Sequence, residues 1–341
     1  MHLSNLTKLP GVSGNEDAVR AYIAEQIKDK CDELWTDTLG NLIALKKGTG
    51  SGRAKMMLGA HMDEVGLILS KITDNGFLKF KTVGGIDPRV LVSKRVLVGE
   101  KQIPGVIGYK AIHLQDKAER ETAAKEKSLY IDIGAKNKKE AEKKVSVGDY
   151  ITFDSGYREF GSNLIKARAL DDRAGCSILM SLLDERYEFD LYLAFTVQEE
   201  VGLRGAKVCA NAIRPDIAVI VEATTCSDVY GTEPQDYATI LGGGAALSII
   251  DRSTYYDKEL VRFLYDLANT NGIAVQYKQT AMGGNDAGAV HLAAGGIRTA
   301  AVSLPARYIH SPSSVISKDD YFACRDLIKL FLQEAKQCLN Y

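Results

Sequence analysis

A stretch of short, turn-separated apolar segments interrupts a chain that otherwise alternates strand-like and helix-like patterns. On both sides of this stretch, apolar runs of strand length are followed by apolar residues at helical spacing. Residues 70–165 instead carry short alternating segments separated by Gly, Pro and Asp, which is the pattern of a small β-barrel. We therefore predict an α/β domain formed by residues 1–69 plus 166–341, with a β-domain of residues 70–165 inserted into it.

The individual elements follow from periodicity and turn signals. Ser13 and Glu16 form a capping-box pattern, which predicts that a helix begins after Ser13. Residues 116–127 carry eight charges in twelve positions and are expected to be a solvated loop or an exposed helix. The α/β part is expected to have strands at 41–45, 56–60, 65–70, 191–197 and 217–221, with helices after 171, between 197 and 217, near 257–271, after 286 and over 319–338. The insert is expected to have strands at 77–83, 95–98, 106–109, 129–133 and 150–153.

Composition excludes several classes of protein. The net charge is −1, from 43 basic and 44 acidic residues, so no overall field attracts nucleic acid or an anionic membrane. No apolar stretch approaches the roughly 20 residues of a membrane span, and the first residues lack a signal-peptide pattern. The six cysteines show no CxxC spacing and are expected to be reduced. We expect a cytoplasmic enzyme with neither nucleic-acid nor membrane partners.

Two adjacent acids close an apparently buried strand. Glu199 and Glu200 follow the apolar run 191–197, and burying two carboxylates is costly unless a metal or a proton compensates them. His61 follows the strand-like run 56–60, and Asp63 is placed to hold the second imidazole nitrogen. Such a group of imidazole and carboxylate ligands is what divalent cations require.

Further candidate ligands lie at the start of a helix, at a strand end and in a turn. These are Asp171, Glu222 and His310, and each has an ordinary structural explanation when taken singly. Their joint placement beside strand ends and turns favours a two-metal hydrolase. The other histidines, His2, His113 and His291, are interpreted as structural.

Seven motifs in the chain match those of a known family. The chain resembles, from end to end, the tetrahedral (TET-type) aminopeptidases, dinuclear metallopeptidases that include glutamyl and deblocking aminopeptidases. The matching segments are Leu9-Pro-Gly-Val-Ser-Gly-Asn-Glu-Asp17, Gly59-Ala-His-Met-Asp-Glu-Val-Gly66, Ile131-Asp-Ile-Gly134, Ala169-Leu-Asp-Asp-Arg-Ala-Gly175, Val197-Gln-Glu-Glu-Val-Gly-Leu-Arg-Gly205, Gly283-Gly-Asn-Asp286 and Arg307-Tyr-Ile-His-Ser-Pro312.

The resemblance implies a mixed-sheet α/β/α catalytic domain with an inserted PA-like β-barrel that mediates dimerisation. It also implies two divalent metal ions per subunit, zinc being preferred and cobalt or manganese the alternatives. One metal would be bound by His61, Asp171 and Glu222, and the other by the shared Asp171, Glu200 and His310. Glu199 would be the catalytic general base and acid.

The resemblance also implies substrates and an oligomeric state, and the chain differs from the family pattern at two positions. Small peptides are the expected substrates, and dimers are expected to build a homo-oligomeric dodecamer. Similar enzymes carry a cis peptide bond after the bridging aspartate, here Asp171–Asp172. The family usually has aspartate in place of Glu222 and threonine in place of Asn285, which affects ligand reach and substrate contacts.

Three alternatives remain open from the residues alone. A two-metal amidohydrolase could use the same ligands on N-acyl substrates, and a glycosidase could pair Glu199 with Glu200. A non-catalytic binding protein could keep the metals without turnover. The sequence does not give the preferred N-terminal residue of the substrate. The residues of the substrate pocket are expected on the loops around 224–236, 252–256 and 282–286.

Overall fold

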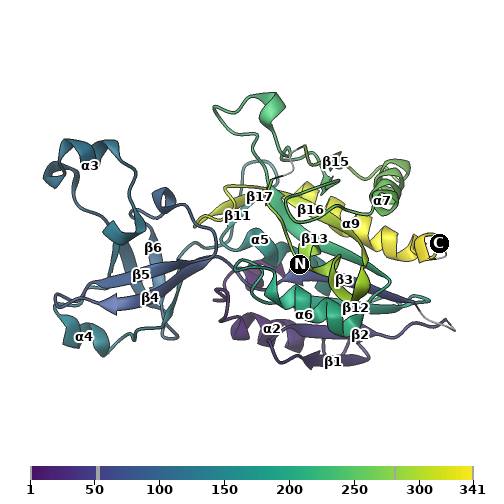
Figure 1. Ribbon diagram of the computed structural model, residues 1–341, viewed down its shortest axis with the longest axis horizontal. Coiled ribbons are helices and arrows are strands. Elements are labelled where there is room, and N and C mark those ends of the chain that lie inside the picture. Colours follow the sequence, from purple (N-terminus) through teal and green to yellow (C-terminus); the bar gives the residue numbers. More distant parts are fainter. Residues whose placement is uncertain (1, 51–53, 280–281, 340–341) are drawn as a thin grey trace.

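The molecule consists of a large α/β body and a β-barrel that stands to one side of it (Figure 1). The computed structural model describes residues 2–50, 54–279 and 282–339. The barrel is formed by one continuous stretch, residues 66–153, and the chain returns to the α/β body after it. Within the described ranges, no helix is both long enough and apolar enough to cross a membrane.

Eleven strands of the described chain form one mixed sheet in the α/β body. Its centre is parallel, in the order β12-β3-β13-β16, and antiparallel strands flank it on both sides. The bounds are β1 Glu33–Thr36, β2 Leu42–Lys46, β3 Lys55–His61, β10 Arg158–Phe160, β11 Leu164–Ala167, β12 Asp190–Thr196, β13 Ile217–Thr225, β14 Ala245–Leu247, β15 Val275–Tyr277, β16 Arg298–Arg307 and β17 Ser314–Ser317.

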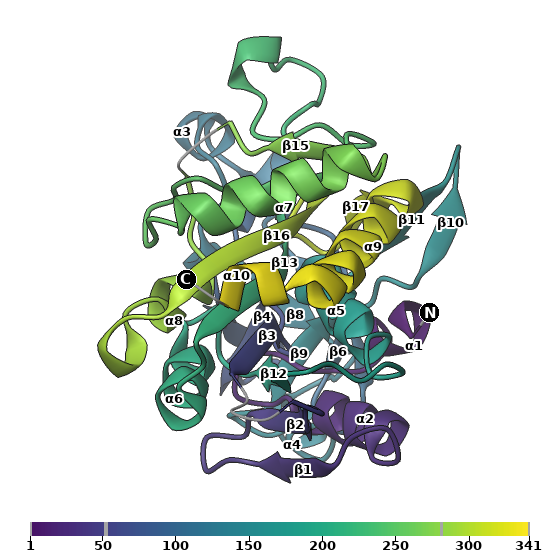
Figure 2. The ribbon, with the colours of Figure 1, turned by 90° about the vertical axis from the view of Figure 1, so that its right-hand side faces the viewer.

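Helices cover both faces of this sheet (Figure 2). On one face α5 packs on β3 and β13 beside α1 and α2, and on the other α6 packs on β12 beside α8. The central strands are therefore buried on both sides, which explains their continuous apolar runs. The helices are α1 Leu3–Leu6, α2 Asp17–Ile27, α5 Leu170–Met180, α6 Arg204–Ile213, α7 Lys258–Thr270, α8 Ala287–Val290, α9 Lys318–Glu334 and α10 Lys336–Leu339, with short 3-10 turns η4 Pro234–Asp236 and η5 Ala293–Gly295.

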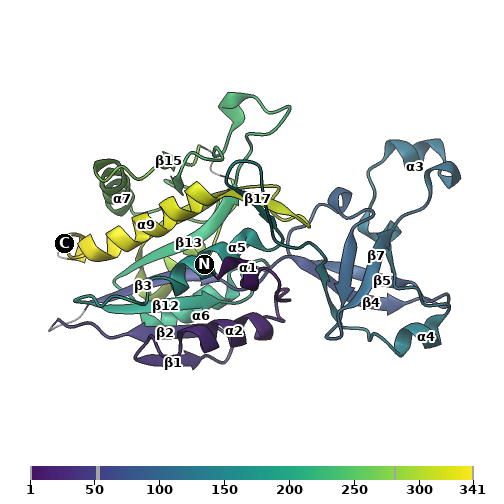
Figure 3. The ribbon, with the colours of Figure 1, turned by 180° about the vertical axis from the view of Figure 1, so that it is seen from behind.

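The barrel closes in the order β4-β5-β8-β7-β6-β9 and has its own apolar core (Figure 3). The charged segment 116–127 is exposed and contains helix α3, which Asp116 and Glu119 cap reciprocally. The barrel elements are β4 Gly66–Ile72, β5 Leu78–Val83, η1 Pro88–Val90, β6 Arg95–Val98, β7 Ile103–Gly108, η2 Ile112–Leu114, α3 Lys117–Glu121, η3 Glu126–Ser128, β8 Tyr130–Asp132, α4 Lys138–Glu142 and β9 Tyr150–Phe153.

The mixed α/β fold with a separate barrel is as predicted, but two local predictions are wrong. Ser13 does not cap a helix: α2 begins at Asp17, the Ser13 hydroxyl donates to Asp63 Oδ2 at 2.6 Å, and Glu16 makes no cap bond. The strand expected at 65–70 is β4, and it belongs to the barrel rather than to the large sheet. A buried acceptor thus outcompetes the local capping pattern. The role of the barrel in dimerisation stays a prediction.

Candidate active site

The candidate residues come from the carboxyl ends of the parallel strands and from the segments that follow them. His61 ends β3, Glu222 lies near the end of β13, and Glu199 and Glu200 follow β12. Asp171 lies in the first turn of α5, and His310 follows β16. Open α/β sheets bind ligands at this edge because the carboxyl ends of parallel strands meet there.

Most of these side chains converge on Asp171. His61 Nε2 lies 3.1 Å from Asp171 Oδ1, and His310 Nε2 lies 3.3 Å from Asp171 Oδ2. His310 Nε2 is also 3.3 Å from Glu200 Oε2. Ligand atoms of Asp171, Glu200 and His310 therefore all lie within 4.8 Å of one another. The two carboxylate oxygens of Asp171 each face a different histidine, which is the arrangement a bridging ligand needs.

Glu199 also lies close to His61. Glu199 Oε2 is 4.0 Å from His61 Nε2, and ligand atoms of His61, Glu199 and Glu200 form a second group within 4.8 Å. Distance alone therefore does not separate a ligand role from a proton-transfer role for Glu199. Glu222 belongs to neither group, but it is buried, and its Oε2 has no hydrogen-bond partner among the described residues.

The electrostatics are those of acids crowded without enough positive charge. Burial, followed by the neighbouring Asp171, raises the pKa of Glu200 to about 8. Burial also raises the pKa of Glu199 and of Glu222 well above the usual range. The acids around each of them disfavour its ionised form further. Bound cations would reverse this effect by favouring the ionised forms.

The pKa shifts of the histidines and of Asp171 instead favour their charged forms. Burial alone lowers the pKa of His310, but the hydrogen bond to Asp171 and the charge of Glu200 raise it to about 9. Burial raises the pKa of Asp171, yet His310 and His61 outweigh burial and hold that pKa well below its usual range. In the absence of other cations, the two imidazoles thus supply part of the positive charge that the acids require.

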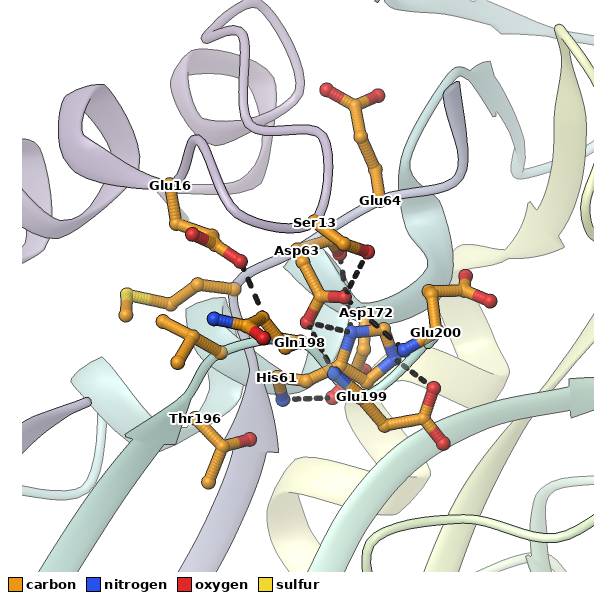
Figure 4. Close-up of polar contacts among 12 residues, drawn as sticks. Ser13, Glu16, His61, Asp63, Glu64, Asp172, Thr196, Gln198, Glu199 and Glu200 are labelled. Atoms are coloured by element: carbon orange, nitrogen blue, oxygen red, sulfur yellow. Dashed lines mark hydrogen bonds and ion pairs between the residues drawn. The ribbon is translucent and has the colours of Figure 1, made fainter. Parts of the chain in front are cut away.

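Asp63 orders the site from behind, as Figure 4 shows. Its Oδ1 accepts from the backbone amide of Glu199 at 3.0 Å, and its Oδ2 accepts from that of Glu200 at 3.1 Å. His61 Nδ1 lies 3.1 Å from the backbone carbonyl oxygen of Asp63 and 3.4 Å from Oδ1. The carbonyl, more than the predicted carboxylate, therefore fixes the imidazole, and Nε2 is left free to face Asp171.

The other predicted features can be placed as well. The Asp171–Asp172 peptide bond is cis, as the resemblance implied. His2 contacts Tyr22, and His291 Nδ1 contacts the Ala287 carbonyl, so these two have structural partners. His113 lies exposed in the barrel.

Sequence reasoning missed three buried side chains behind the site. Glu16 and Asn41 accept hydrogen bonds from the segment that carries Glu199. Asp286 accepts from Thr196 Oγ1 at 2.5 Å. Motif matching included Glu16 and Asp286, and Glu16 was read as part of a capping box, but neither was given a role at the site, because these contacts span more than 80 residues and leave no local pattern.

The donor set fits divalent metal ions. Two imidazole nitrogens and several carboxylates point at one another, and a buried oxygen of Glu222 lacks a partner among the described residues. Nitrogen and carboxylate ligands of this kind suit zinc, cobalt and manganese. The fold and the site thus define an α/β enzyme whose site can hold metal.

Comparison with known proteins identifies the family. The model of the M42 glutamyl aminopeptidase family matches residues 40–327. A putative aminopeptidase of Acetivibrio thermocellus is 42% identical over 320 residues, covering 93% of each chain. The chain therefore belongs to the M42 glutamyl aminopeptidase family. Members of this family are metal-dependent hydrolases that act as exopeptidases.

Solved structures agree on the fold. The TET1 peptidase of Pyrococcus horikoshii, which can assemble into a tetrahedron or a large octahedral shell, superposes with a TM-score of 0.86 at 34% identity, covering 97% of this chain and 98% of that one. A Thermotoga maritima protein described as an endoglucanase superposes with a TM-score of 0.83 at 38% identity, covering all of both chains. The resemblance to TET-type aminopeptidases is confirmed.

Proposed function

We propose that this enzyme removes N-terminal residues from small peptides with a water activated by two metal ions, and that Glu199 is the general base and acid. The observation that carries the proposal is Asp171, whose two carboxylate oxygens face His61 and His310 at 3.1 and 3.3 Å. Glu199 lies beside this pair and shares a group with His61 and Glu200. One set of residues thus supplies both ligands and a proton acceptor.

In this proposal His61, Asp171 and Glu222 hold one metal, and Asp171, Glu200 and His310 hold the other. When bound, two such ions polarise the scissile carbonyl and lower the pKa of water toward neutrality. The burial of Glu222 and its unpartnered Oε2 support its assignment as a ligand. Zinc is the preferred metal, with cobalt or manganese as alternatives.

Glu199 takes the proton of the attacking water and then delivers it to the leaving amine. The geometry supports this role: Glu199 Oε2 lies 4.0 Å from His61 Nε2, and Glu199 belongs to one group with His61 and Glu200. Asp63 holds the backbone amide of Glu199, so the carboxylate is aimed from a fixed point. Proton transfer at the Glu199 carboxylate then needs no movement of the main chain.

The same cluster favours substrates with a free α-ammonium group. The carboxylates of Glu199 and Glu200 lie in one group with His61, and a peptide N-terminus brings a positive charge that such acceptors can bind. An N-acylated substrate lacks this charge. Acceptors at this centre therefore favour an aminopeptidase over an amidohydrolase that acts on N-acyl amino acids.

Substrate class tests the proposal. Metal-loaded enzyme is expected to hydrolyse at least one member of a panel of aminoacyl-anilides, and to leave the matching N-acetyl amino acids intact. Hydrolysis of the N-acetyl compounds alone would contradict the proposal. Cleavage of soluble cellulose that persists in chelator would instead support the glycosidase that the Thermotoga description suggests.

We also propose that the protein is cytoplasmic and assembles through dimers into a dodecamer. All six cysteines lie in the described ranges and are free thiols, which suits a reducing compartment. The barrel exposes apolar side chains, including Ile112 at 71% and Leu114 at 63%. Apolar side chains that gather into an exposed patch are typical of surfaces that contact another chain, so these two positions are the ones to test.

Light scattering on metal-replete protein is expected to give the mass of twelve 37.2-kDa chains. Replacing Ile112 and Leu114 together by Asp should lower this mass, because two charges would then be buried in the contact. The matched control is Val208→Asp, an exposed apolar position on α6. A monomer in the wild type, or loss of assembly only in the control, would contradict the role given to the barrel.

A further inference from the structure

Four consecutive backbone amides around the two glutamates donate to side chains from three distant segments. This turn, residues 197–200, directly follows β12. The donors and acceptors are Val197 N to Asn41 Oδ1 at 3.0 Å, Gln198 N to Glu16 Oε1 at 3.2 Å, Glu199 N to Asp63 Oδ1 at 3.0 Å and Glu200 N to Asp63 Oδ2 at 3.1 Å. Side-chain acceptors thus replace the strand pairing that β12 loses at its end.

The turn needs such support because its backbone is strained. Gln198 has a φ of 57°, in the left-handed region that residues other than glycine seldom occupy. Conformations of this kind are costly and persist only where the surroundings hold them. Gln198 immediately precedes Glu199, so its conformation sets the direction in which the Glu199 side chain leaves the main chain.

Glu16 is committed to this turn and not to its own helix. It is the N-cap residue of α2, where a side chain normally accepts from the first helical amides, yet it makes no such bond. Its Oε1 accepts instead from Gly14 N at 2.7 Å. It also accepts from Gln198 N, a contact that Figure 4 shows. The residue is 4% exposed, so its carboxyl is buried at a cost that helix capping does not explain.

The N-terminal segment that carries Glu16 is itself fixed beside the site. Arg168 donates to the carbonyls of Lys8 and Leu9 at 2.9 and 2.8 Å and pairs with Glu64 at 2.7 Å. Gly11 N donates to the same Glu64 carboxylate at 3.1 Å. Glu64 directly follows Asp63, so the segment before Glu16 and the Asp63 acceptor are held as one unit.

We infer that Glu16 is a positioning residue for Glu199, acting through the backbone amide of Gln198. The inference rests on the proposed role of Glu199 as the proton-transfer group. Removing the Glu16 acceptor would leave the Gln198 amide unpaired and let the strained turn relax, which would move the Glu199 carboxylate from its working position. Small misplacements of a catalytic group are enough to lower turnover strongly.

Two variants of Glu16 and one control test the inference. Glu16→Ala, assayed with an aminoacyl-anilide, is expected to lower kcat by about 10–100-fold, the usual cost of losing a residue that orients the reacting groups. KM and the metal content should change little. Glu16→Gln keeps an oxygen acceptor and is expected to restore most of the turnover. The control, Glu25→Ala, changes an exposed acid on the same helix and should match the wild type.

A double-mutant cycle separates positioning from general damage. In a Glu199→Gln background, Glu16→Ala should cost less than about threefold, because the group it positions is already absent. Equal losses in both backgrounds, a Gln variant as slow as the Ala variant, or wild-type turnover in Glu16→Ala would each overturn the inference. If Glu199→Gln alone retains full turnover, the proposed function fails instead, and the cycle shows which of the two is wrong.

Discussion

Replacing Glu199 by Gln is expected to lower kcat by about 10²–10⁴-fold, the range that general acid–base catalysis supplies. The amide has nearly the shape of the carboxyl but cannot take a proton from water or return one to the leaving amine. The fold should persist, because the backbone amide of Glu199, rather than its side chain, binds Asp63. Steady-state kinetics with an aminoacyl-anilide measure the loss of turnover, circular dichroism checks the fold, and elemental analysis of the purified variant gives its metal content.

The adjacent acid provides the matched control. Glu200 Oε2 lies 3.3 Å from His310 Nε2, and Glu200→Gln should therefore weaken metal binding at one site. Glu199→Gln should keep both metals. The assigned roles are reversed if Glu199→Gln loses metal and Glu200→Gln does not.

Replacing Asp171 by Ala is expected to remove both metals and to abolish measurable peptide hydrolysis. Its two oxygens face His61 and His310, so one substitution takes a ligand from each site. Glu222→Gln is the comparison, because it alters a ligand of only one proposed site. Elemental analysis and the anilide assay at saturating metal distinguish the two variants.

If both metals remain bound to the Asp171→Ala variant, the bridging role of Asp171 is contradicted. Circular dichroism should show that the variant is folded, since loss of the whole structure would also release metal. Asp171→Asn, which keeps the size of the side chain, serves as the second variant where the alanine variant proves unstable.

The architecture could be predicted because its strands carry strong local signals. The apolar runs of β3, β12 and β13 are buried on both faces, and their ends mark where ligands gather. The prediction missed β16 and β17, together with the short edge strands. β16 pairs with β13, and β17 pairs with β11, which are distant in the sequence. β1 and β10 instead form short hairpins with β2 and β11.

The hydrogen-bond partners of the residues that support the site could not be predicted from sequence. Ser13 and Glu16 match a capping box, yet Ser13 donates to Asp63 and Glu16 accepts from Gln198. The local pattern is real, but buried partners 50 and 182 residues away determine where the two side chains go. Sequence periodicity contains no information on such contacts, whereas ligands at strand ends are marked by the strands themselves.

Metal titration of chelator-treated protein tests the two-metal proposal most directly. Elemental analysis would give the zinc bound per chain, and hydrolysis of an aminoacyl-anilide would give activity at each step of the titration. The account predicts no measurable hydrolysis in the metal-free chain and full hydrolysis only when two ions are bound per chain. Full activity in verified metal-free protein, or at one ion per chain, would contradict it.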